Sequence, residues 1–173
     1  MIRADQHLVL VGMMGVGKST IGRIAAERLG RVLVDTDALV EQRAGQTVRE
    51  IFAAEGEGGF RARESAALAE ALAAATPAVI ATGGGIVLAE HNRQLLDGAA
   101  ARVVWLSAEP STLVDRLRAS AGGTSARPLL DGDAEGTLQR MCAEREALYR
   151  SVADTIVRVD QRSVSDVVEA VLR

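Results

Sequence analysis

Short apolar runs that alternate with longer amphipathic segments restrict the fold of this chain more than any other feature. The apolar runs lie at residues 7–12, 31–35, 78–82, 102–107 and 155–160. Their length and the turn residues around them predict strands. Strands that are apolar on both faces and separated by helices form parallel sheets that helices cover on both sides. The sequence therefore predicts a three-layer α/β/α fold.

Apolar residues at helical spacing, and glycines that close several segments, predict the connecting helices. We expect helices at residues 19–29, 38–45, 47–56, 61–75, 90–96, 109–120, 135–149 and 165–172, with a loop at 121–133. No repeat and no linker interrupts this pattern, and 173 residues suit a single domain. Ligands of such sheets bind beyond the carboxyl ends of the strands, so the residues that follow each strand are the candidates for function.

The first strand runs into the glycine loop GMMGVGKST, which satisfies the pattern G-x-x-x-x-G-K-[ST]. Glycines let phosphate oxygens approach the backbone N–H groups, and the helix that follows adds its positive end. The loop therefore predicts a nucleotide triphosphate site. The expected contacts are Gly12, Met14, Gly15, Val16, Gly17, Lys18, Ser19 and Thr20.

Lys18 is the only lysine among the 20 basic residues of the chain. In this kind of loop the lysine reaches the β- and γ-phosphates, and the hydroxyl that follows, here Ser19, binds Mg²⁺. We therefore expect ATP and Mg²⁺ as ligands.

Two carboxylates, Asp35 and Asp37, follow the second strand. Asp35 is the candidate for holding Mg²⁺, and Asp37 the candidate for orienting an acceptor hydroxyl and taking its proton. A helix begins at the same point, and an N-cap role explains one of the two acids equally well.

Arg61 and the glycines Gly83, Gly84 and Gly85 predict a second binding wall. We place Arg61 at a helix start, where its charge opposes the helix dipole, which favours a role in holding an anion. Three glycines after the third strand let a second molecule approach the backbone. A solvated arginine and a plain strand-to-helix turn remain the alternatives.

Several other arginines are candidates for phosphate or base contacts. Arg127 lies in the loop at 121–133, from where it can close over phosphates, and Arg145 follows on the next helix. Arg116 or Arg118 is expected to stack on an adenine, and Arg162 to border the same base. A surface position is the alternative for each of them.

Composition excludes several classes of protein. The net charge of −3 gives no reason to expect a nucleic-acid partner or a membrane surface, and no apolar run approaches the length of a membrane span. The single cysteine allows no internal disulfide, which fits a reducing cytoplasm.

The ordered set GMMGVGKST, DTD, GGFR, TGGG, RPLL and REALY resembles the shikimate kinase family of small P-loop kinases, over essentially the whole chain. The resemblance implies a five-stranded parallel sheet of order 2-3-1-4-5. It also implies transfer of a phosphoryl group from MgATP to the 3-hydroxyl of shikimate, by a cytoplasmic protein that is expected to be a monomer.

The same resemblance implies roles for individual residues. Asp37 would bind the hydroxyl and act as the base, Arg61 and Arg145 would hold the substrate carboxylate, and residues 83–85 would line its other side. Arg127 would belong to a lid at about 121–133, and helices at about 36–65 would bind the substrate.

Two other interpretations remain open. A gluconate kinase shares this fold and loop, although the His-Pro run expected after its acidic pair is missing from DTDALVEQRAG. A nucleotide-binding switch would need the loop and the magnesium ligands but no second binding wall.

Overall fold

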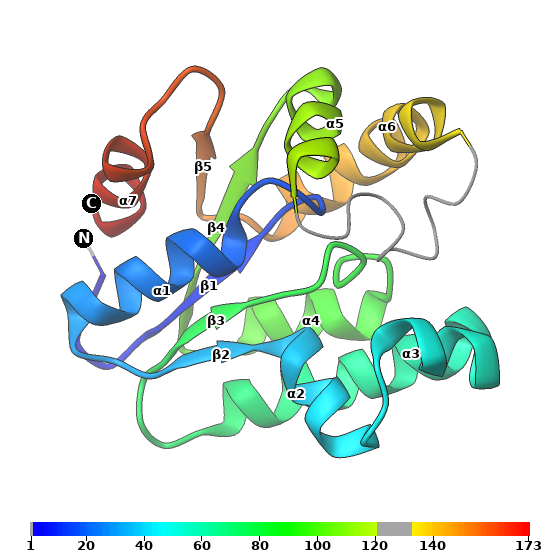
Figure 1. Cartoon of the computed structure of the whole chain (residues 1–173). Coiled ribbons are helices and arrows are strands. Elements are labelled where there is room, and N and C mark those ends of the chain that lie inside the picture. Colours follow the sequence, from blue (N-terminus) through cyan, green and yellow to red (C-terminus); the bar gives the residue numbers. More distant parts are fainter. Residues whose placement is uncertain (1, 121–132) are drawn as a thin grey trace.

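The computed structural model describes residues 2–120 and 133–173. Their helices and strands alternate for most of the chain (Figure 1). In chain order the elements are β1 (His7–Val11), α1 (Lys18–Leu29), β2 (Leu33–Asp35), α2 (Thr36–Ala44), α3 (Val48–Ala73), β3 (Val79–Ala81), α4 (Glu90–Gly98), β4 (Ala101–Ser107), α5 (Pro110–Ala119), α6 (Ala134–Val152), β5 (Thr155–Arg158) and α7 (Val164–Leu172).

The strands form one parallel sheet in the order β2-β3-β1-β4-β5. The predicted fold class and strand order are therefore confirmed. β1 is central, because it pairs with β3 on one side and with β4 on the other. Each of its five residues is buried, which explains why residues 8–11 are continuously apolar.

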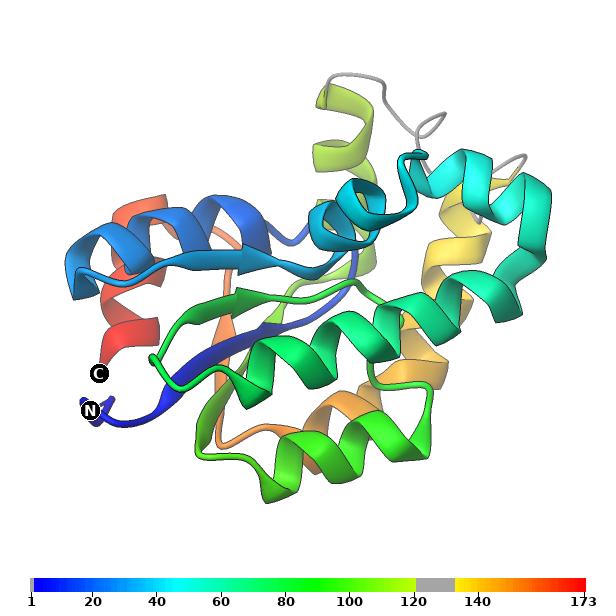
Figure 2. The same cartoon turned by 90° about the horizontal axis from the view of Figure 1, so that it is seen from below.

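Helices cover both faces of the sheet. α1 and α7 pack together on one face, while the second part of α3, with α4 and α6, covers the other (Figure 2). The described core consists mainly of Val, Leu, Ile and Ala from the strands and the inner faces of these helices. The beginning of the described chain and its C-terminal end lie close together, at the end of the sheet opposite the carboxyl ends of the strands.

α2, the first part of α3 and α5 lie around the carboxyl ends of the strands (Figures 1 and 2). A smaller apolar cluster joins α2 to α3 and is separate from the main core; it is formed by Val40, Ile51, Phe60 and Ala67. The residues of the predicted substrate-binding helices therefore have a core of their own.

The structure corrects the expected helix start at Arg61. α3 extends from Val48 to Ala73 and contains one break, at Gly56, where φ is 70° and ψ is −175°. Glycine is the residue that tolerates this conformation, and the helix resumes directly after it. Arg61 therefore lies more than one turn beyond the start of the second helical part, where the effect of the helix dipole has fallen off.

In the part of the chain that the structure describes, no helix is long and apolar enough to cross a membrane.

Candidate functional site

The loop between β1 and α1 exposes its backbone because its glycines adopt angles that other residues rarely do. The φ angles of Gly12, Gly15 and Gly17 are 145°, 81° and 104°. A Cβ atom at Gly12 would also collide with the carbonyl oxygen of Leu106. Gly17 precedes α1 and has no side chain with which to cap it. The first turn of α1 is therefore able to offer its N–H groups to an anion.

Lys18 lies in the mouth of this loop and is almost completely buried. Its Nζ donates hydrogen bonds to the carbonyl oxygens of Gly12, at 2.7 Å, and Met13, at 2.9 Å. These bonds keep the ammonium group over the loop, where a bound phosphate would meet it.

Ser19 and Asp35 come together although they lie on different elements. Ser19 Oγ donates to Asp35 Oδ2 at 2.5 Å, while Asp35 Oδ1 accepts from the N–H groups of Asp37 and Ala38. Asp35 is therefore the N-cap of α2 and a neighbour of Ser19 at once. A hydroxyl and a carboxylate are hard oxygen donors that fit Mg²⁺, which usually keeps phosphate and water oxygens as its other ligands. No cluster of three or more acidic, His or Cys side chains occurs within residues 2–120 and 133–173 that would enclose a metal by itself.

One carboxylate oxygen of Asp37, Oδ1, is buried without a hydrogen-bond donor among the described residues. The pKa of Asp37 is raised to about 6, mainly by burial and then by the nearby carboxylates of Glu64 and Asp35, while the charges of Lys18 and Arg61 oppose the rise. A buried oxygen of this kind calls for a donor, and a ligand hydroxyl would supply one.

Gly83 and Glu64 lie beside Asp37. A Cβ atom at Gly83 would collide with Glu64 Oε1 and come within 2.7 Å of Asp37 Oδ1. The N–H of Gly83 donates to the buried hydroxyl of Thr36, at 3.1 Å. Burial raises the pKa of Glu64, and the charge of Arg61 opposes it. The absence of a side chain at position 83 therefore makes room for two carboxyl groups.

Arg61 lies against the same wall. Its guanidinium group packs directly on the backbone of Gly85, so closely that a Cβ atom at that position would collide with it. Its Nη1 donates to Glu64 Oε2 at 2.8 Å, and its Nε and Nη2 donate to Glu57 Oε1 at 3.3 and 3.1 Å. Arg61 is thus held between a buried and an exposed acid.

Arg145 and Tyr149 approach the glycines from α6. Arg145 Nη1 and the Tyr149 hydroxyl both donate to the carbonyl oxygen of Gly84, at 3.1 and 2.5 Å. Arg145 is buried, and its Nε has no hydrogen-bond partner among the described residues. Burial raises the pKa of Tyr149, so its hydroxyl remains a donor at neutral pH.

A cleft of about 300 Å³ connects the loop to this wall, and its lining includes Lys18, Ser19, Asp35, Asp37 and Gly84. Phosphate-binding groups and an unpartnered carboxylate therefore face one space. A second cavity, of about 310 Å³, lies on the other side of the loop and is lined by Gly15, Gly17, Arg116, Arg162 and Val167, among others.

A family model for shikimate kinase matches residues 14–173 of the chain. The chain belongs to the shikimate kinase family. It is 51% identical to a shikimate kinase from Symbiobacterium thermophilum and 46% identical to one from Pseudomonas aeruginosa, in each case over 96% of this chain and 94% of the relative. A structure of the shikimate kinase from Acinetobacter baumannii in complex with shikimate superimposes with a TM-score of 0.90. That protein is 36% identical, and the match covers 96% of this chain and 90% of the other.

As a member of the shikimate kinase family, the protein is an ATP-dependent phosphotransferase. The structure brings together the predicted residues of the loop, the acidic pair and the glycine wall. It also places Arg61 and Arg145 at that wall, on α3 and α6.

The two arginines proposed for adenine stacking differ in position. Arg116 Nη1 donates to the carbonyl oxygen of Val16, at 2.9 Å, and Arg116 lines both the cleft and the second cavity. Arg118 is exposed, and its Nη2 lies 3.7 Å from Glu135 Oε2. The geometry favours Arg116. Arg127 and most of the expected lid at 121–133 lie outside the described residues.

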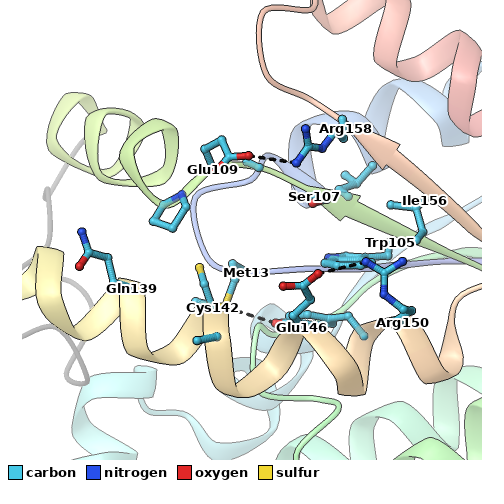
Figure 3. Close-up of a pocket in the computed structure, with 15 residues that line it drawn as sticks. Met13, Trp105, Ser107, Glu109, Gln139, Cys142, Glu146, Arg150, Ile156 and Arg158 are labelled. Carbon is cyan, nitrogen blue, oxygen red and sulfur yellow. Dashed lines mark hydrogen bonds and ion pairs between the residues drawn. The ribbon is translucent and has the colours of Figure 1, made fainter.

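A larger cavity, of about 510 Å³, lies between β4 and α6, next to Met13 and Tyr149 (Figure 3). Its charged side chains pair with each other: Glu109 with Arg158, and Glu146 with Arg150, both at 3.0 Å. Arg150 also covers the ring of Trp105. These charges are already compensated, so the cavity is a poorer candidate for anion binding than the cleft.

Two residues of the site, Glu64 and Thr36, were not predicted from the sequence. Glu64 lies three residues after Arg61, a spacing that puts both side chains on one face of a helix. That spacing was the available signal, but it does not reveal that Glu64 is buried.

Proposed function

We propose that this chain transfers the γ-phosphoryl group of ATP to the 3-hydroxyl of shikimate, which yields shikimate 3-phosphate and ADP. The family supports the overall reaction, and the geometry of the cleft supports the roles of individual residues. One observation carries the assignment. Asp37, whose Oδ1 has no hydrogen-bond partner among the described residues, lines the same cleft as Lys18, so an acceptor and a phosphate donor would meet there.

The nucleotide would lie with its phosphates on the glycine loop. The backbone N–H groups and Lys18 would bind the phosphate oxygens, while Arg116 and Arg162 would border the base. Ser19 and Asp35 would hold Mg²⁺, directly or through water, and the ion would neutralise charge on the β- and γ-phosphates.

The acceptor would bind against the glycine wall. Asp37 would accept a hydrogen bond from the 3-hydroxyl, orient its oxygen toward the γ-phosphorus and take its proton during transfer. Arg61 and Arg145 would hold the carboxylate of the acid, because charge-assisted hydrogen bonds fix both its place and its orientation. Catalysis would then depend on alignment and on neutralisation of charge.

Residues 1–173 would form one kinase domain, with substrate-binding helices at about 36–65. The lid at about 121–133 would carry Arg127 to the phosphates. We expect a monomer in the cytoplasm, which size-exclusion chromatography with light scattering would test for the oligomeric state.

A coupled assay for ADP release tests the function against its rivals. Three reactions contain MgATP with shikimate, with gluconate or with no acceptor. We expect rapid ADP release only in the reaction that contains shikimate. Release with gluconate would favour a gluconate kinase, and equal release without an acceptor would favour a nucleotide-hydrolysing switch.

A further inference from the structure

We propose that, in the substrate-free protein, Glu57 binds the donors of Arg61 that the substrate needs, and that the carboxylate of the substrate must displace Glu57. Glu57 thereby sets the affinity for the acid without contacting the reacting atoms. This inference rests on the proposed function, in which Arg61 binds the carboxylate of shikimate.

The contacts of Arg61 show which of its donors are taken. Nη1 is bonded to Glu64, while Nε and Nη2 both donate to the single oxygen Oε1 of Glu57. The Nε and Nη2 donors form one of the edges that match a carboxylate in a two-bond arrangement. Because the guanidinium face rests on Gly85, the substrate has little access from that side. The edge that the substrate needs is therefore occupied by an acid of the same chain.

The two acids differ in how easily they leave. The side chain of Glu64 is fully buried, whereas that of Glu57 is 49% exposed. Release of Glu64 would leave a buried charge without its partner, which is strongly unfavourable. Release of Glu57 would return a carboxylate to water, and exposed ion pairs contribute little to stability. Of the two acids, Glu57 is therefore the one that a substrate carboxylate would displace from Arg61.

Glu57 could also serve only to stabilise the helix, and the test has to distinguish this role from competition for Arg61. It follows Gly56, where α3 breaks, and so begins the second helical segment. A carboxylate is favourable at that position because of the helix dipole, whether or not it contacts Arg61. A purely structural role predicts a change in stability and no change in substrate affinity.

The central experiment compares Glu57→Gln with the wild-type protein in steady-state kinetics. We expect the shikimate KM to fall by about two- to five-fold, since one exposed ion pair no longer competes. We expect kcat and the KM for ATP to stay unchanged. Glu55→Gln is the matched control, because Glu55 pairs with Arg63 on the same helix and its substitution removes the same charge. The control should have the wild-type KM.

Glu57→Asp separates contact from charge. It keeps the negative charge at the start of the segment but shortens the side chain by one methylene, which weakens its reach to Arg61. We expect its shikimate KM to fall toward that of the Gln variant. A wild-type KM in Glu57→Asp, or an unchanged or raised KM in Glu57→Gln, would overturn the proposal.

The failure of the inference differs from that of the proposed function. Arg61→Ala should raise the shikimate KM; if it does not, Arg61 is not the carboxylate ligand and the premise is wrong. If the wild-type protein shows no shikimate-dependent ADP release, the proposed function itself is wrong. If the wild-type protein is active and Arg61→Ala raises the shikimate KM, but Glu57→Gln leaves it unchanged, the proposed function stands and the inference about Glu57 is wrong.

Discussion

Two side chains in one cleft, Lys18 and Asp37, place opposite requirements on whatever binds between them. Lys18 brings a positive charge that is held over the loop by two carbonyl oxygens. Asp37 brings a buried oxygen without a hydrogen-bond donor among the described residues. A phosphate satisfies the first and a hydroxyl the second, so the pair is suited to a reaction that joins them.

Lys18→Met should lower kcat by at least about 10²-fold, because it removes a preorganised charge from the transferring phosphoryl group. The fold should persist, since Met has a similar length and the loop keeps its glycines. Turnover in the coupled assay and far-UV circular dichroism measure the two effects. Near-wild-type turnover would refute the role of the loop.

Asp37→Asn should reduce kcat by about 10²- to 10⁴-fold, since the amide cannot take the proton. ATP affinity, measured by calorimetry, should change little because the proposed partner of Asp37 is the acceptor. An effect confined to ATP binding would reverse the roles of Asp35 and Asp37.

Asp37 should also make the stability of the protein depend on pH. Its pKa is raised to about 6 in the folded state, so the folded protein binds a proton more readily than the unfolded chain does. The resulting stabilisation is present at about pH 4 and is lost as the pH rises through about 6. Relative to Asp37→Asn, the wild-type protein should lose about 1 kcal/mol or more over this range in urea unfolding. An identical pH dependence in both proteins would contradict the raised pKa.

At the scale of single elements, α3 shows what decides the position of Arg61. Gly56 breaks the helix and lets its two parts change direction, while Gly58 and Gly59 continue it. A sequence reading that takes glycines as helix ends places the second helix too late. Gly56 and Gly58 are both glycines of the same run, so residue type alone does not show which of them adopts the positive φ.

Gly56→Ala tests this break. It should destabilise the protein by about 1–3 kcal/mol, because Ala is strained at these angles. No atom lies within 4 Å of the added methyl group, so strain alone would be responsible. Gly58→Ala is the control: its site is equally open, its φ is not positive, and helix propensity predicts a gain of up to about 1 kcal/mol. Equal effects in urea unfolding would show that Gly56 does not require its special conformation.

Local patterns allowed much of the fold and the site to be predicted. The loop at 12–20 and the acidic pair follow apolar runs, so their positions depend only on where strands end. Arg116 and Arg118 were harder to separate, since a two-residue step on α5 turns one toward Val16 and the other toward Glu135. The burial of Glu64 could not be predicted, because it results from contacts between α3 and the turn after β3.

At the scale of the whole molecule, the sheet brings residues from opposite parts of the chain to one edge. β1 and β3 are neighbours, so the loop after β1 meets the glycines after β3, and α6 adds Arg145 from far along the sequence. The central position of β1 thus explains why nucleotide and acceptor groups share one cleft.

Ligand binding should therefore stabilise the whole fold. Shikimate at about one hundred times its Kd should add about 2.7 kcal/mol. This corresponds to a rise in Tm of roughly 5–10 °C for a chain of this size. Gluconate at the same concentration serves as the control. An equal shift with both acids would show that the wall does not discriminate between them.

The most direct test of the central claim is the position of the phosphate in the product. The protein is incubated with MgATP and shikimate, and the product is analysed by phosphorus–proton correlation NMR. The account predicts one new phosphate ester whose phosphorus couples to the proton on C3 of the ring. Coupling to another ring proton, or inorganic phosphate as the only new phosphorus species besides ADP, would contradict it.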